Sequence, residues 1–206
     1  MNSQTSRWHR RLAERALDLV GRDFVAAVPD RCWVAGFTHV KTRSAVVLVA
    51  FVVDTFSRRI VGWSAATVKE TVFVLDAPVT AIWQQARGQR PLKPGELVHH
   101  SGAGSQYTSF KLADHLETAG IAVSIGSVGD AYDNALMEST IGLHKTELIE
   151  PRRPWKTLSQ VEPATAEWAD WYNHRRLHGG TGHVPLVECE ANYYTELPKL
   201  QVTTPV

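Results

Sequence analysis

Side chains that could hold a divalent metal ion lie on and just before a predicted helix that carries Glu138. Asp130 and Asp133 precede it in a glycine-containing loop, and Lys145 follows it by seven residues. Mg²⁺ takes oxygen ligands, usually one or two carboxylates completed by water and phosphate. A spacing of seven places Glu138 and Lys145 two helical turns apart on one face, and Gly142 between them would leave that face open to a close approach. As an alternative to a shared functional face, Glu138 and Lys145 are both solvated and lie too far apart to form an ion pair.

Histidines and cysteines give weaker candidate ligands. His39 and the pair at 99–100 can bind transition metals, but such residues more often form hydrogen bonds within a sheet. The pair His174 and His178 has a spacing of four, but a zinc site would need more ligands than we can identify. Cys32 and Cys189 lie far apart without metal-ligand spacing, which favours reduced thiols.

Composition indicates an ordinary globular protein. The 206 residues, 44% apolar and 21% charged, fit one domain of about 150 residues plus extensions. With 22 basic and 21 acidic residues the formal charge is +1, so any nucleic-acid surface must be local. The longest apolar run, residues 45–53, is too short to span a bilayer, and the first residues lack an apolar signal segment. We therefore predict a cytoplasmic protein with no membrane association.

The elements that must position these residues alternate between strand and helix patterns. Three runs rich in Val, Ile, Phe and Trp, separated by short polar turns, predict a three-stranded meander over 32–40, 45–53 and 59–66. The later patterns predict a helix over 70–85 that contains Pro78, a strand over 97–100, a helix over 110–119, a strand over 121–125, a helix from Asp133 or Asn134 to 149, and a helix over 159–173. This order predicts an α/β fold with one mixed five-stranded sheet and helices on both faces.

Three segments are expected along the chain. Residues 1–28 form a basic arm with a short helix over 10–20, either packed on the core edge or contacting phosphate. Residues 29–150 form the core that carries Glu138. Residues 151–206 supply a helix, then glycine-broken coil and a tail that complete the core.

Three stretches resemble the active-site motifs of retroviral-integrase-type transposases of bacterial insertion sequences. They are WVAGFTHV, VHHSGAGSQYTS and YDNALMESTIGLHKTEL. That family carries Asp, Asp and Glu in these motifs, the last two separated by 35 residues, on a ribonuclease-H-like fold. Here the matching positions are Gly36, Gly102 and Glu138, and 35 residues lie between the last two. Members usually begin with a helical DNA-recognition region, so the short arm before the first strand suggests a shortened reading frame.

The resemblance implies DNA strand transfer with Mg²⁺ or Mn²⁺ held by three carboxylates. Glycine supplies no ligand, so Glu138 alone would form a weak and incomplete site, with Asp130 and Asp133 as candidate substitutes. We therefore predict a catalytically inactive transposase core. Two alternatives stay open: a regulatory or inhibitory partner of an intact transposase, and an active strand transferase that uses substitute ligands.

The resemblance also implies DNA as a partner, bound by a homo-oligomer or by an assembly with an intact transposase. Lys145 lies at the spacing where the family contacts DNA ends, and Gln106 lies in a shared SQY stretch. The segment WADWYNHRR resembles the family's closing aromatic helix, which implies phosphate contacts for Arg175 and Arg176. Its aromatic residues could stack on bases or dock the last helix on the core; they are Trp168, Trp171 and Tyr172.

Asp54 is a further acid at a strand end. A hairpin about 41–44 would place it near Arg31, five residues or about 16 Å from the level of Gly36 along the strand. We therefore predict a role in the turn before Ser57 rather than in a metal site.

Overall fold

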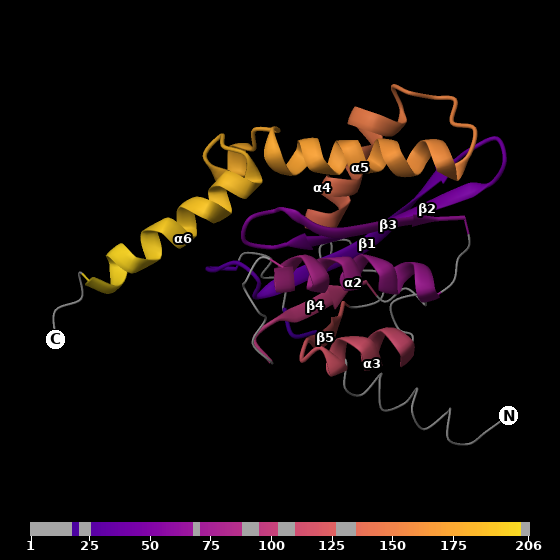
Figure 1. Ribbon diagram of the computed structural model, residues 1–206. Coiled ribbons are helices and arrows are strands. Elements are labelled where there is room, and N and C mark those ends of the chain that lie inside the picture. Colours follow the sequence, from indigo (N-terminus) through magenta and orange to yellow (C-terminus); the bar gives the residue numbers. More distant parts are fainter. Residues whose placement is uncertain are drawn as a thin grey trace, which may run out of the picture.

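The computed structural model describes residues 18–20, 26–67, 71–87, 95–102, 110–126 and 135–202. Strands and helices alternate along these residues as the sequence pattern predicts (Figure 1). The strands are β1 (Cys32–Lys41), β2 (Val46–Asp54), β3 (Ile60–Ala66), β4 (Val98–Ser101) and β5 (Ala122–Ile125). The helices are α2 (Thr71–Arg87), α3 (Phe110–Thr118), α4 (Ala135–Leu143), η2 (His144–Ile149), α5 (Leu158–His174), η3 (Gly179–Thr181) and α6 (Leu186–Val202).

The strands form one mixed sheet in the order β3-β2-β1-β4-β5. β2 pairs antiparallel with β1 and β3, because short turns join these three strands. β4 pairs parallel with β1 and with β5; along the chain, α2 connects β3 to β4 and α3 connects β4 to β5. The predicted five-stranded mixed sheet is confirmed.

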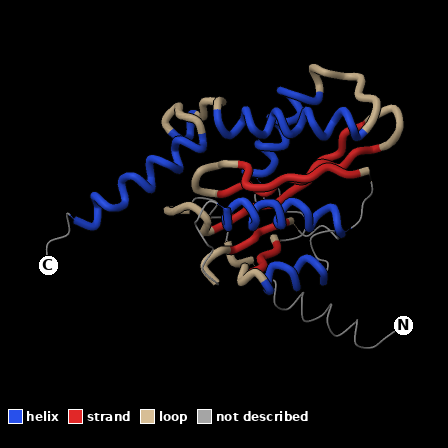
Figure 2. The backbone as a smooth tube through the Cα atoms, viewed as in Figure 1, coloured by secondary structure: helices blue, strands red, loops and turns tan. Residues whose placement is uncertain are grey.

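Helices cover both faces of the sheet (Figures 1 and 2). Side chains alternate along each strand, so Val34 and Phe51 pack with α4, η2 and α5 on one face. Trp33 and Val52 pack with α2 and α3 on the other face. Because both faces are buried, the central strands read in the sequence as nearly continuous apolar runs rather than as an alternating pattern.

The helix predicted to end near residue 149 does so, but its last turn is wider than an α-helix. η2 is a π-helix in which the amide of Glu150 donates to the carbonyl of Lys145 at 2.8 Å, five residues back. α2 runs through Pro78 without a break. Residues 18–20 form a bend rather than the last turn of the predicted helix over 10–20, and the rest of that helix lies outside the described residues.

The glycine-broken coil predicted after residue 173 is confirmed over residues 175–185, but α6 corrects the prediction of a tail beyond it. It is a 17-residue helix over sequence that contains Pro198, a residue that argues against a helix interior. The sequence did hold a start signal, because Pro185 directly precedes the helix and Glu188 lies in its first turn.

Candidate active site

The three positions suggested by the motifs lie close together beside the carboxyl end of β4. Gly36 lies within β1 and Gly102 directly follows β4. The parallel register pairs Ala35 with Ser101, so the next residues along the two strands, Gly36 and Gly102, are neighbours. The side chain of Met137 in α4 covers the Gly36 position, and Glu138 is the next residue in the first turn of that helix.

The described residues do not fit a two-metal site. Gly36 and Gly102 contribute no side chain, and Glu138 is exposed. In the part of the chain that the structure describes, no group of three His, Cys, Asp or Glu residues could hold a metal ion. The other candidates from the sequence, Asp130, Asp133 and Gln106, lie outside the described residues.

The face of the α4–η2 helix that carries Glu138 and Lys145 points away from the core, since both side chains are exposed. The opposite stripe is buried and fixes the helix on the sheet; it consists of Met137, Thr140, His144 and Leu148. Apart from its own helix and chain neighbours, a Cβ atom at Gly142 would meet none of the described residues within 4 Å. An acid and a base are therefore presented on an open helix surface.

His144 anchors this helix to its neighbours. Its Nε2 lies 3.3 Å from the hydroxyl of Thr165, and its ring packs edge-on against Phe51 and Trp168, with centroids 5.1 Å and 5.0 Å away. Burial, and then the charge of Lys145, lower the pKa of His144 to about 4. The imidazole is therefore neutral at physiological pH and serves as a packing residue.

Asp54 corrects the predicted hairpin register. It pairs with Trp33 rather than lying near Arg31, because a four-residue loop over 42–45 joins Lys41 to Val46. Because it pairs with Trp33, its side chain lies on the face of the sheet opposite to that of Gly36.

The carboxylate of Asp54 organises the turn that follows β2, as predicted. It accepts hydrogen bonds from the amide of Asp30 at 3.0 Å and from the amide and hydroxyl of Ser57 at 2.7 and 2.8 Å. Burial raises the pKa of this carboxyl, against the hydrogen bonds from Ser57 that lower it.

The other candidate ligands lie in separate environments. His99 and His100 are buried on opposite faces of β4, and Nδ1 of His100 lies 2.9 Å from the hydroxyl of Ser124. Burial lowers the pKa of His99 to about 4. His39 is exposed, with its ring edge-on to Phe37. His174 lies beside Asp170 at the end of α5, not in a metal cluster.

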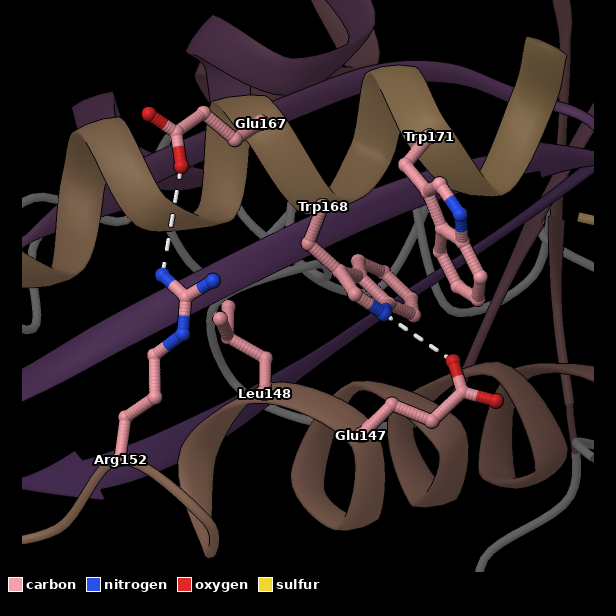
Figure 3. Close-up of a pocket in the computed structure, with 6 residues that line it drawn as sticks. All are labelled: Glu147, Leu148, Arg152, Glu167, Trp168 and Trp171. Atoms are coloured by element: carbon pink, nitrogen blue, oxygen red, sulfur yellow. Dashed lines mark hydrogen bonds and ion pairs between the residues drawn. The ribbon is translucent and has the colours of Figure 1, made fainter. Parts of the chain in front are cut away.

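The aromatic residues of α5 mainly dock that helix on the core, which supports the second of the two interpretations offered above. Trp168 and Tyr172 are 5% and 3% exposed and belong to the same apolar cluster as β1 and β2. Trp171 is 40% exposed and lines a pocket of about 330 Å³ between η2 and α5 (Figure 3).

Arg176 has an internal partner, whereas Arg175 is exposed. The guanidinium of Arg176 donates to Glu147 through Nε at 3.0 Å and Nη2 at 2.9 Å. The second carboxylate oxygen of Glu147 accepts from the indole of Trp168 at 3.1 Å (Figure 3). Of the two arginines, only Arg175 is exposed, whereas Arg176 is partly buried and paired.

The sequence motifs did not predict the structural roles of Asn173 and Glu147. The side-chain amide of Asn173 donates from Nδ2 to the backbone carbonyl of Ile60 at 2.9 Å. Its Oδ1 accepts from the backbone N–H of Ile60 at 3.0 Å. This residue ties the end of α5 to the first residue of β3. Asn173 stands in a motif that the sequence did show, but no sequence signal indicates its partner 113 positions away.

A mixed five-stranded sheet with helices on both faces and a carboxylate position on the helix after β5 has the ribonuclease-H-like arrangement of integrase catalytic cores. The integrase core domain family matches residues 26–131 and, in a second match, residues 119–185. The chain belongs to this family.

Known relatives and solved structures agree with that assignment. The chain is 50% identical over 183 residues to a putative transposase for insertion sequence element IS986/IS6110 of Mycobacterium tuberculosis, and the match covers 88% of this chain and 65% of the relative. The chain thus spans about two thirds of that relative's length. A chain of the simian T-cell lymphotropic virus intasome, solved with PP2A regulatory subunit B56 gamma, matches with a TM-score of 0.65 at 17% identity, covering 80% of this chain and 55% of that chain.

The HTLV-2 integrase catalytic core domain, solved in complex with magnesium in a trimeric form, shares the same fold. Its TM-score is 0.57 at 18% identity, covering 80% of this chain and 99% of that chain.

None of the helices in the described part of this chain has the length and apolar character needed to cross a membrane.

Proposed function

We propose that this protein is an insertion-sequence transposase core that binds DNA without catalysing metal-dependent strand transfer. The observation that carries this proposal is the composition of the site. Three positions come together beside the carboxyl end of β4. Glu138 is the only one of the three whose side chain could be a ligand. The 50% identity to a putative insertion-sequence transposase supports the biological context.

Strand transfer on a phosphodiester requires two divalent ions about 4 Å apart, one at the attacking oxygen and one at the leaving oxygen. A lone carboxylate leaves such ions without the ligands that fix their positions. Removal of one preorganised transition-state contact commonly costs about 100- to 1000-fold in rate. Two missing ligands in one unit cost more, although the losses are not additive. The described residues therefore support binding rather than catalysis.

The proposed DNA surface consists of the exposed face of the α4–η2 helix and the end of α5. Lys145 and Arg175 are exposed cations in these two elements. Cations that neutralise phosphates supply most of the sequence-independent affinity for DNA. The overall charge of +1 is no obstacle, because such a surface acts locally.

A nicking and joining assay tests the loss of catalysis. The unmodified chain is compared with a variant that carries Gly36→Asp, Gly102→Asp and Met137→Ala, on plasmid DNA with candidate insertion-sequence ends and Mg²⁺ or Mn²⁺. We expect activity only in the variant, and we expect Glu138→Gln to remove it. Strand transfer by the unmodified chain would contradict the proposal and would point to Asp130 or Asp133 as ligands.

A second candidate function is a regulatory partner of an intact transposase. The observation that favours it is the position of α6, which extends away from the body of the protein (Figure 1). Co-purification with a tagged full-length transposase tests this function, with a variant that ends after residue 190 as the control. A stable complex that needs the projecting part of α6 would favour the regulatory function, and the absence of any complex would exclude it.

A further inference from the structure

The two glycines at the candidate site have opposite surroundings. A Cβ atom built on Gly36 would overlap Cγ of Met137, with Sδ at 3.2 Å and Cβ at 3.5 Å. Among the residues that the structure describes, a Cβ atom built on Gly102 would meet nothing within 4 Å. One ligand position is therefore filled by a neighbouring side chain, and no described side chain fills the other.

Met137 has little freedom to move out of the way. Its side chain is 0% exposed and packs in the apolar cluster that includes Val34 and Phe51. The backbone that carries it is held by His144 and Leu148, which are buried on the same side of the α4–η2 helix. Protein interiors are close-packed, so displacing a buried methionine requires its neighbours to rearrange.

We infer that Met137 closes the first metal-ligand position, so that aspartates placed at residues 36 and 102 do not by themselves rebuild a metal site. A carboxylate at position 36 would meet an apolar side chain where the ion should stand, and burial beside it would disfavour the charged form. The thioether does not replace the missing ligand, because Mg²⁺ and Mn²⁺ prefer oxygen. This inference rests on the proposed function in one respect, the assignment of residues 36 and 102 as ligand positions.

Thermal melting of alanine variants tests the packing part of the inference without any metal. Alanine in place of glycine within a strand is otherwise neutral or stabilising. We expect Gly36→Ala to lower the melting temperature by several degrees, whereas the matched control Gly102→Ala leaves it unchanged or raises it. In a Met137→Ala background, where the space is vacated, Gly36→Ala should instead raise the melting temperature. A Gly36→Ala change that is harmless with Met137 present would overturn the inference.

Titration with Mn²⁺ tests whether Met137 prevents metal binding. Binding is measured by calorimetry or by the loss of the EPR signal of the free ion. The variant with Gly36→Asp and Gly102→Asp is compared with the same variant carrying Met137→Ala, after both are shown to fold by circular dichroism. We expect the three-residue variant to bind Mn²⁺ at least tenfold more tightly, and we expect Glu138→Gln to remove that gain. Equal affinity of the two variants would overturn the inference.

The two proposals fail separately. Strand transfer by the unmodified chain would contradict the proposed function and leave the packing of Met137 against residue 36 intact. Conversely, a harmless Gly36→Ala change would remove the steric inference and leave the missing ligands as the reason for inactivity.

Discussion

Basic side chains of this protein differ in their surroundings, as a comparison of Lys145, Arg175 and Arg176 shows. Lys145 and Arg175 are exposed, while the guanidinium of Arg176 is held by Glu147. A cation already paired inside the protein would have to give up that partner to bind a phosphate. The exposed cations are therefore the better candidates for DNA contacts.

Lys145→Ala should weaken binding of duplex DNA and reduce the slope of log K against log salt concentration by about one, because one phosphate contact is lost. Fluorescence anisotropy with a labelled duplex at several salt concentrations measures both quantities. Lys156→Ala, an exposed lysine on the connection before α5, is the matched control. An equal effect of both substitutions would show that the α4–η2 face has no special role.

At the scale of elements, α5 is joined to the rest of the fold by different contacts along its length. Its buried residues, among them Val161 and Trp168, pack on the same cluster as β1 and β2. At its end, Asn173 forms two hydrogen bonds with the backbone of Ile60, which is 3% exposed. These contacts hold α5 across the sheet face on which the α4–η2 helix also lies.

Asn173→Ala should destabilise the protein by about 1–3 kcal/mol, because it leaves a buried N–H and carbonyl of Ile60 without their partner. Urea unfolding followed by circular dichroism measures the change. Asn192→Ala, on the exposed surface of α6, is the control and should have no measurable effect. A neutral Asn173→Ala would mean that water replaces the amide at no cost.

A chain that ends after residue 150 should fail to melt cooperatively, since it lacks α5 and with it Val161, Trp168 and Tyr172 of the apolar cluster. Differential scanning calorimetry of that chain, beside one that ends after residue 202, measures this effect. A cooperative transition in the shorter chain would instead show that residues 29–150 fold as an independent core.

For the whole molecule, two buried histidines link stability to pH. His99 packs on the face covered by α2 and α3, and His144 on the face covered by α4 and α5. The pKa of each is lowered to about 4, mainly by burial. Unfolded histidines take up protons near pH 6.5, so the unfolded state binds more protons between pH 6.5 and 4. Their contribution is complete above pH 6.5 and is lost as the pH falls toward 4.

The melting temperature should therefore fall steeply between pH 6.5 and 4. The free energy of unfolding should decrease by an amount on the order of 2–3 kcal/mol per histidine at the acid end. Melting curves across this range measure it. His144→Gln should flatten the dependence, although it lowers stability at neutral pH, whereas His115→Gln at an exposed position of α3 should not. An unchanged slope in His144→Gln would exclude that histidine as a cause.

The sequence by itself determined the elements and the approximate place of the site. The apolar runs predicted β1, β2 and β3, and the resemblance to the integrase-type motifs implied that Gly36, Gly102 and Glu138 belong together. These features are local or depend only on distance along the chain. They could therefore be inferred without knowing which residues touch.

The tertiary structure alone decided what surrounds those residues. The loop over 42–45 set the register that pairs Asp54 with Trp33, and packing placed Met137 over Gly36 but put no described side chain over Gly102. The partner of Arg176 was likewise fixed by packing between η2 and α5. Such contacts join residues far apart in sequence, and their identity depends on side-chain volumes and on the way two elements meet. No local pattern encodes that information.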